Sequence, residues 1–200
     1  KPIIGLRTAN HGFRGPLPYS INNRQVRIGE LLGGTFLSHH GNWHQDSTRG
    51  DIIPKMKEHP ILIGVQNIWG PSDVYRTYKE GSGLPVGCTA LVMGQPLIDR
   101  QQGGATNPEK APLPVVWFKH WKTTGGQTAR VLQSTMGSGK DLQNPGLRRL
   151  IINATYWGLE MEDQISAESS VAYTGIYEPL ESGFSYKKRG IAPHPPAFYR

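Results

Sequence analysis

Short apolar runs separated by glycine, proline and polar residues dominate the hydrophobic pattern of this chain. Runs of roughly four to eight apolar residues bounded by turn residues are typical of β-strands. The strands that this pattern predicts cover residues 2–6, 35–38, 73–77, 89–93, 115–118 and 129–134, with shorter apolar pieces at 51–53 and 61–63. A hairpin turn is expected at Gly125 and Gly126, between the last two of these strands.

Two segments have the spacing of amphipathic helices. In residues 21–32 apolar positions recur at helical intervals, and the segment ends at a glycine pair beginning with Gly33, as helices often do. The pattern in residues 145–159 is clearer, because Asn144 is a favoured N-cap residue and Pro145 is favoured at the first helical position. We therefore expect two helices, the second with an apolar face toward the core.

Residues 2–6 (PIIGL) are apolar at every position except one glycine, which is typical of a strand buried on both faces of a parallel sheet. An interior strand needs a neighbour on each side. We therefore expect further strands of the same domain to precede residue 1. In open α/β sheets ligands bind beyond the carboxyl ends of the strands, so the polar residues that follow residues 2–6 occupy a favoured place for a site.

Composition narrows the class of protein. At 200 residues with 36% hydrophobic residues, the chain is long and apolar enough for one globular domain. No apolar stretch reaches the roughly 18 residues of a membrane-spanning helix. Cys88 is the single cysteine, which excludes an internal disulfide and a cysteine-rich zinc site. The net charge of +7 comes from scattered basic residues without a nucleic-acid-reading motif, so we expect no nucleic-acid partner.

The turn after residues 2–6 carries the first candidate site residues, Arg7, Thr8 and His11. A strand followed by a tight polar turn resembles a nucleophile elbow, but arginine cannot act as a nucleophile. Arg7 and His11 could instead orient an anion or a group of sugar hydroxyls. The alternative is structural: Arg7 would cap backbone carbonyls, and His11 would be a histidine satisfied within the fold.

Residues 38–46 (SHHGNWHQD) place three of the seven histidines within six positions. Imidazoles this close to a carboxylate could hold a divalent metal ion at His39, His40 and His44, although the spacing matches no helix-borne metal motif. A second interpretation is a polar loop whose histidines bind backbone groups. A third is a sugar site in which Trp43 offers its apolar face to a sugar ring.

A Gly–Pro turn at Gly70 leads to Asp73 and Tyr75, at the start of an expected strand. Asp73 could act as a general base or bind hydroxyl groups. It could equally cap the turn. Further along, residues 136–141 (MGSGKD) lack the first glycine and the final hydroxyl of a phosphate-binding loop, so no nucleotide site is expected there.

Taken in chain order, these motifs resemble the ThuA-like family, which is named for trehalose utilisation, and particularly its planctomycete-type members. The segments that carry the resemblance are residues 2–11 (PIIGLRTANH), 59–61 (HPI), 69–75 (WGPSDVY), 114–117 (PVVW), 129–137 (ARVLQSTMG) and 148–157 (RRLIINATYW). The resemblance runs from residue 1 to about residue 162. We therefore expect one domain over residues 1–162, followed by an extended tail or linker over residues 163–200.

The resemblance implies the fold of the class I glutamine amidotransferase-like superfamily, a flavodoxin-like three-layer α/β/α sandwich whose first strands precede residue 1. True amidotransferases of this fold carry a cysteine at the elbow and a histidine after a later strand. Matching these motifs puts Arg7 at the cysteine position and Ser138 at the histidine position. The resemblance therefore implies a domain without glutamine amidotransferase activity.

For function, the resemblance implies a carbohydrate-related role in trehalose or other disaccharide utilisation, with hydrolase-like action on a sugar. Asp73 or a loop histidine would then act as the base, and Arg7 would steady developing negative charge. The catalytic candidates are Arg7, His11, His40 and Asp73, and the substrate-binding candidates are Thr8, His39, Trp43, His44, Tyr75 and Ser138. No cofactor is expected beyond the metal option at the three histidines.

An alternative function is a non-catalytic sugar-binding or protein-docking domain, tethered through the tail to another module. The lack of an assignable nucleophile favours this alternative, whereas the density of polar groups at the strand ends favours an enzyme. The expected partner is a small carbohydrate, with a fused or docked domain beyond the termini. Family members of this type are often exported, which makes a periplasmic or extracellular location an open expectation.

Overall fold

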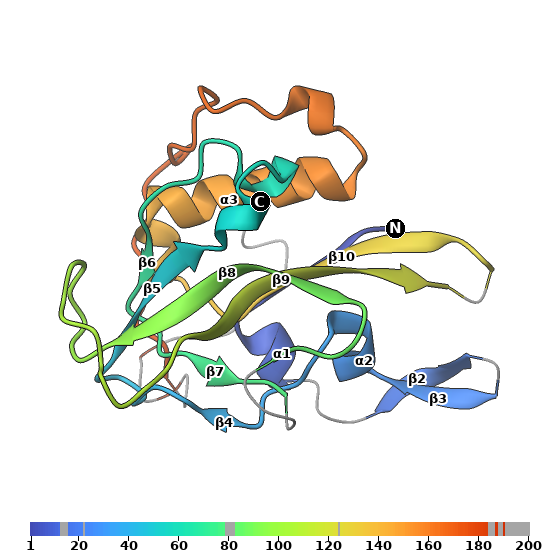
Figure 1. The fold of residues 1–200 in the computed structure, drawn as a ribbon, viewed down its shortest axis with the longest axis horizontal. Helices are drawn as coiled ribbons and strands as arrows, with labels where there is room; N and C mark the ends of the chain where they lie inside the picture. Colours follow the sequence, from blue (N-terminus) through green and yellow to red (C-terminus); the bar gives the residue numbers. More distant parts are fainter. Residues whose placement is uncertain are drawn as a thin grey trace.

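The computed structural model of the chain describes residues 1–12, 16–21, 23–78, 83–123 and 125–183, together with Lys187 and Gly190. Within these residues, six strands form one curled, mixed sheet (Figure 1). In spatial order they are β1 (Ile3–Leu6), β10 (Thr128–Ser134), β9 (Leu113–Lys122), β8 (Cys88–Leu97), β5 (Ser47–Ile52) and β6 (Ile68–Gly70). Two small sheets pair β2 (Pro16–Ile21) with β3 (Arg24–Arg27) and β4 (Ser38–His39) with β7 (Tyr75–Arg76).

The described α-helices are α1 (Thr8–Gly12), α2 (Ile28–Leu32) and α3 (Pro145–Gly158). Short 3₁₀ turns cover Pro54–Met56, Pro60–Leu62, Asp141–Gln143 and Glu162–Gln164. In Figure 1, α3 lies on one side of the six-stranded sheet, and α1 and α2 lie on the other. A mixed sheet flanked by helices is compatible with the α/β class predicted from the sequence, although β1–β10 is the one parallel pair among the six described strands of this sheet.

The strands predicted at residues 89–93, 115–118 and 129–134 are confirmed as parts of β8, β9 and β10. β9 runs antiparallel to both β8 and β10, so these three strands form an up-and-down arrangement. The turn between β9 and β10 uses Gly126 at a φ of +76°, a conformation that glycine adopts without steric cost. Sequential antiparallel strands can be joined by such short turns, which explains why this part of the sheet is readable from local sequence.

β1 pairs in parallel with β10, in register from Ile3 opposite Val131 to Leu6 opposite Ser134. The predicted burial of this strand on both faces is wrong in part, because Ile3 and Ile4 are only half-buried. Among the described residues β10 is the single neighbour of β1, and an edge strand is covered less completely than an interior one. Strands preceding residue 1 stay a prediction.

The helix predicted over residues 21–32 is wrong in its first half. β3 continues to Arg27, and the helix that follows has five residues. The side chain of Val26 is buried while its neighbours Gln25 and Arg27 are exposed, which is the period of a strand. The predicted glycine ending is confirmed, since Gly33 follows α2 at a left-handed φ of +82°.

Several short predicted strands are smaller than expected. Within residues 35–38 only Ser38 is in a strand, and within residues 73–77 only Tyr75 and Arg76 are. The apolar piece at 61–63 overlaps a 3₁₀ turn, because Pro60 fixes the backbone φ near the helical value. Short apolar runs therefore mark buried positions here more reliably than they mark strands.

The hydrophobic core lies between α3 and the six-stranded sheet. As predicted, Asn144 caps α3: its Oδ1 accepts the N–H of Leu147 at 2.9 Å, and Pro145 is the first helical residue. The buried apolar residues of the helix are Leu147, Leu150, Ala154 and Trp157. Their core partners on the sheet include Leu91 and Val92 of β8, Val115 and Val116 of β9, and Leu132 of β10.

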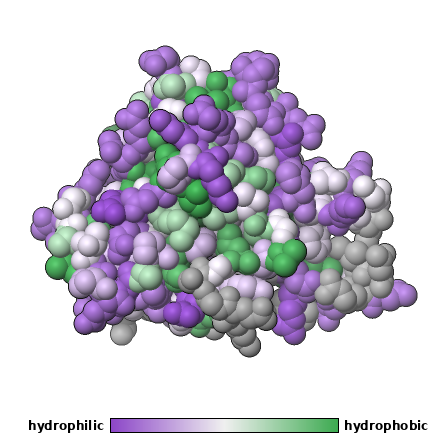
Figure 2. Space-filling model, in the orientation of Figure 1, coloured by the Kyte–Doolittle hydropathy of each residue, from purple (hydrophilic) through white to green (hydrophobic). Residues whose placement is uncertain are grey.

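Residues 165–183 form no helix or strand, and most of residues 184–200 lie outside the described part. The division into a domain over residues 1–162 and a tail or linker over residues 163–200 stays a prediction. None of the described helices is both long and apolar enough to span a bilayer. The face in Figure 2 carries hydrophilic residues over most of its area, with apolar groups scattered between them.

Candidate functional site

A strained turn stands at the carboxyl end of β1. The strand ends at Leu6, Arg7 has a φ of +39°, and α1 begins at Thr8. Positive φ is uncommon outside glycine and carries a steric cost. The turn is held by the backbone N–H of Arg7, which donates to the carbonyl of Ser134 at 2.9 Å. This strand–turn–helix geometry is the elbow that the sequence predicted.

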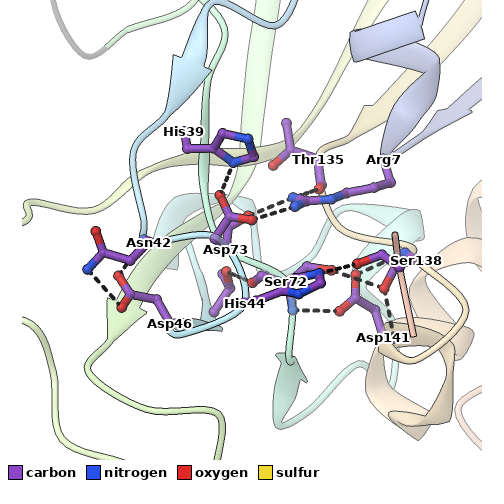
Figure 3. A network of polar contacts seen from close by, with 12 residues as sticks. Arg7, His39, Asn42, His44, Asp46, Ser72, Asp73, Thr135, Ser138 and Asp141 are labelled. Carbon is purple, nitrogen blue, oxygen red and sulfur yellow. Dashed lines mark hydrogen bonds and ion pairs between the residues drawn. The ribbon is translucent and has the colours of Figure 1, made fainter. Parts of the chain in front are cut away.

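The guanidinium of Arg7 is buried and internally bonded. Its Nη1 donates to the backbone carbonyls of Asp73 at 2.6 Å and Thr135 at 2.9 Å, and its Nη2 donates to Oδ1 of Asp73 at 2.7 Å (Figure 3). The group also lies over the ring of Tyr75, with Cζ 3.6 Å from the ring centroid. Arg7 therefore joins three segments of the fold, which agrees with the structural alternative considered for this residue.

Asp73 links Arg7 to His39. Its Oδ2 lies 2.7 Å from Nδ1 of His39, and its own side chain is 1% exposed while that of His39 is 37% exposed. Since a carboxylate can only accept, the contact fixes the neutral imidazole as the tautomer with a proton on Nδ1. The Nε2 atom then carries a lone pair. An aspartate that orients a histidine in this way leaves Nε2 competent as a general base.

Arg7, His39 and Tyr75 belong to the lining of a pocket of about 350 Å³, whereas Asp73 does not. The pocket is lined by Leu6, Arg7, Thr8, His11, His39, Trp43, Tyr75, Gly137, Ser138, Gly139, Ser182 and Gly183. The lining combines hydroxyl groups, imidazoles and two aromatic faces. A concave site with a few convergent polar groups is the usual form of a small-molecule site.

Aromatic contacts hold the pocket wall in place. The ring of Phe36 lies 4.7 Å from that of Tyr75, 5.1 Å from that of His39 and 4.2 Å from that of His11, measured between centroids. Burial raises the pKa of Tyr75 above its ordinary value, with the charge of Arg7 opposing the shift. The phenol therefore stays protonated at neutral pH.

Ser138 is positioned by Asp141, a residue that the sequence argument did not select. Asp141 is fully buried, and its Oδ2 accepts the N–H groups of Gly137 and Ser138, each at 2.9 Å. Its Oδ1 accepts the N–H of Ser72 at 3.1 Å, and the hydroxyls of Ser72 and Ser138 lie 3.0 Å apart (Figure 3). One carboxylate thus fixes the loop after β10 against the turn that carries Asp73.

The predicted site residues fall into three groups. Those that line the pocket are Arg7, Thr8, His11, His39, Trp43, Tyr75 and Ser138. Asp73 lies beneath it, bonded to Arg7 and His39. The remaining two histidines bond elsewhere: Nε2 of His40 lies 2.8 Å from the carbonyl of Ala111, and Nε2 of His44 lies 3.2 Å from Oγ of Ser182. Their functional roles stay predictions.

The structure assigns the three loop histidines to separate partners, which are Asp73 for His39, Ala111 for His40 and Ser182 for His44. No three histidine, cysteine, aspartate or glutamate side chains gather as a metal-binding group in the described part of the chain. The geometry gives the metal option no specific support.

Two pocket residues, Ser182 and Gly183, come from the tail and were not expected there. No local pattern predicts this contact, because His44 and Ser182 are 138 positions apart. Asp141 had a weak local signal, a serine followed by an aspartate three positions later, which is a pattern of side-chain to backbone bonding in turns.

A larger cavity of about 560 Å³ lies between α2 and β9. Its lining includes Arg27, Glu30, Gly33, Lys119 and Trp121, and none of the predicted site residues is part of it. The elbow, the Asp73–His39 contact and the Asp141 loop all belong to the smaller pocket, so the chemistry is concentrated there. An α/β protein with a polar, aromatic-walled pocket at a strand end is the class that fold and site together define.

No protein-family model, curated protein or solved structure matches the chain.

Proposed function

We propose that this chain is a ThuA-like domain with a flavodoxin-like fold, that its pocket binds a small carbohydrate, and that it acts on that carbohydrate in a hydrolase-like manner. The observation that carries the proposal is the Asp73–His39 pair, which presents an imidazole to a pocket walled by Trp43 and Tyr75.

The fold proposal is supported by the parallel pairing of β1 with β10 and by the elbow at Arg7. Helices on both sides of the sheet are compatible with a three-layer sandwich. In a flavodoxin-like domain further parallel strands would pair with the free edge of β1. Ligands of such sheets bind beyond the carboxyl ends of the strands, where the elbow and Ser138 lie.

Carbohydrate is the ligand class that suits the lining best. A sugar ring has an apolar C–H surface and a rim of hydroxyl groups, so it favours aromatic side chains combined with neutral hydrogen-bonding groups. Trp43 is 39% exposed and belongs to the pocket lining. Thr8, Ser138 and Ser182 offer hydroxyls that can both donate and accept.

In the proposed reaction, a water molecule gives its proton to Nε2 of His39 while its oxygen bonds to the anomeric carbon of the sugar. The bond between that carbon and the departing sugar oxygen breaks, and the imidazolium returns the proton to this oxygen. Asp73 keeps the Nδ1 proton and stabilises the positively charged ring. Arg7 is a positioning residue that holds Asp73 in place. The chain forms no covalent bond to the sugar.

The test uses the full chain with trehalose and glucose as probes. A ligand that binds the native state raises its Tm by mass action, so we expect trehalose to raise the Tm of the wild type and glucose to be released with time. His39→Gln should bind trehalose within about threefold of the wild type and lose roughly 10²- to 10⁴-fold in turnover. His120→Gln is the matched control, since His120 is exposed on β9 and lies near Trp157, outside the pocket lining.

His40→Gln separates the geometric assignment from the sequence-based one. The contacts in the structure favour His39 as the base, whereas the sequence predicts His40 as a catalytic residue. Loss of turnover in His40→Gln alone would support the sequence-based assignment. If the wild type neither binds nor cleaves the sugars, the proposed function is wrong.

A non-catalytic sugar-binding domain is the second candidate function. It is favoured by one observation, that the elbow position is occupied by an arginine whose guanidinium is committed to Asp73 and Thr135. Trehalose binding of equal strength in the wild type and His39→Gln, with no glucose release from either, would favour this second function.

A further inference from the structure

The tail returns to the pocket after leaving α3. Ser182 and Gly183 form part of the pocket lining, next to Ser138 and Gly139. The phenol of Tyr177 donates to the carbonyl of Gly139 at 2.7 Å. Pro179 also packs on this loop, since a Cβ atom added at Gly139 would lie 3.0 Å from Cβ of Pro179. Tyr177 and Pro179 therefore fix the first part of residues 177–183 to the loop after β10.

The same segment is attached to two other loops beyond Pro179. Glu181 pairs with Arg100 at 2.9 Å, in the connection between β8 and β9. Oγ of Ser182 lies 3.2 Å from Nε2 of His44, whose ring centroid lies 4.0 Å from that of Trp43 at a tilted angle. Residues 177–183 therefore run from the loop after β10 to the Trp43 side of the pocket.

The hydrogen bonds and the ion pair that hold residues 177–183 are solvent-exposed. The side chains of Ile176 and Leu180 are 94% and 60% exposed, so they bury little apolar surface that would hold the segment down. Exposed ion pairs and hydrogen bonds are individually weak. A segment held in this way can open at low cost and close again over a ligand.

We propose that residues 177–183 form a strap that completes the sugar pocket and sets the size of the sugar it accepts. This inference rests on the proposed function. With the strap in place the pocket measures about 350 Å³, near the lower end of small-molecule sites. That volume suits roughly one or two sugar rings. A longer sugar must displace the strap and lose the Ser182 hydroxyl as a partner.

The test compares the affinities of the full-length wild type and a double variant, Tyr177→Phe with Glu181→Gln, for trehalose and maltotetraose by isothermal titration. The double variant removes the Tyr177 hydroxyl and the Glu181 charge without removing buried apolar surface. Tyr173→Phe is the matched control, because Tyr173 lies in the same tail and donates to the carbonyl of Leu142 instead of to the pocket loop. Hydrogen exchange of the amides in residues 177–183 is followed without sugar.

We expect the wild type to prefer trehalose over maltotetraose and the double variant to lose roughly three- to tenfold of its trehalose affinity. The ratio of trehalose affinity to maltotetraose affinity should also fall in the double variant. Amide hydrogen exchange in residues 177–183 should be faster than in the wild type. Tyr173→Phe should match the wild type in all three measurements. Unchanged trehalose affinity together with an unchanged preference for trehalose over maltotetraose in the double variant would overturn the proposal that residues 177–183 act as a strap.

Failure of the proposed function looks different. If the wild type binds neither sugar, the pocket is not a carbohydrate site, and the strap has no role in selecting sugars. Exchange in residues 177–183 that is equally fast in the wild type and the double variant would overturn the strap itself, whatever the ligand.

Discussion

The guanidinium of Arg7 binds both the main-chain carbonyl and the side-chain carboxylate of Asp73. Nη1 of Arg7 donates to the Asp73 carbonyl at 2.6 Å and Nη2 donates to Oδ1 at 2.7 Å, although the two residues are 66 positions apart. Their side chains are 8% and 1% exposed. This contact connects the elbow after β1 to the residue that orients His39, so the order of the pocket depends on it.

Arg7→Met removes the charge while keeping a long side chain, and it leaves the Asp73 carboxylate buried without its cation. Loss of one partner of a buried ion pair typically costs about 3–5 kcal/mol. We expect the free energy of unfolding, measured by urea denaturation, to fall by that amount. Arg49→Met is the control, because the Arg49–Asp51 pair is about half exposed and should be worth about 1 kcal/mol or less. Equal losses at both positions would contradict the importance assigned to Arg7.

Asp141→Ala leaves the N–H groups of Ser72, Gly137 and Ser138 without their acceptor in a buried place. A buried unsatisfied group costs about 1–3 kcal/mol, so we expect a total loss of roughly 2–4 kcal/mol in unfolding free energy. Weaker trehalose binding should accompany it, because Ser138 loses its fixed position. Asp163→Ala, on the exposed turn after α3, should change neither quantity. A stability loss below about 1 kcal/mol for Asp141→Ala would show that these N–H groups find other partners.

Stability should depend on pH through His59. Its Nδ1 accepts the N–H of Ile61 and caps the turn at Pro60–Leu62, while its ring packs 4.7 Å from that of Phe118. Burial lowers the pKa of His59, with Glu162 opposing and Arg130 adding to the shift. Because the folded state resists protonation, the contribution is complete above the unfolded pKa of about 6.5 and is lost as the pH falls through the folded pKa.

We expect the free energy of unfolding of the wild type to decrease below pH 6.5 more steeply than that of His59→Asn, which keeps a capping acceptor but does not titrate. Urea denaturation at several pH values measures the difference. Parallel pH profiles for the two proteins would assign the acid sensitivity to other groups.

Trp43→Ala tests the aromatic wall. Since the indole is 39% exposed and therefore more than half buried, its removal should lower the free energy of unfolding by about 1–2 kcal/mol. Trehalose affinity should fall roughly tenfold, the size of loss expected when an aromatic contact is removed from a binding site. Trp121→Ala, in the larger cavity, is the comparison. A larger loss of trehalose affinity in Trp121→Ala than in Trp43→Ala would move the sugar site to that cavity.

Local patterns predicted α3 and the strands β8 to β10 because each carries its own signals: Asn144 and Pro145 for the helix start, and continuous apolar runs for the strands. They failed between residues 21 and 32, where the helical spacing of distant apolar positions was given more weight than the alternation around Val26. The elbow was predictable because a buried strand followed directly by a polar turn is a local feature.

The candidate site was predictable only at residues whose type alone indicates a chemical role. His39 and His40 are neighbours, and successive residues of an extended chain point in opposite directions. The sequence could not tell which of them faces Asp73, and the structure assigns that place to His39. Asp141 was missed because its partners are backbone N–H groups, which every residue type except proline carries.

The arginine at the elbow also constrains how this chain can evolve. In a domain that places a nucleophile at this turn, the residue is free to be selected for reactivity alone. Here the same position anchors Asp73, the Thr135 carbonyl and the Tyr75 ring. A single substitution to cysteine or serine would introduce a reactive group and remove the anchor in one step. Acquiring a nucleophile at this turn would therefore require compensating changes elsewhere first.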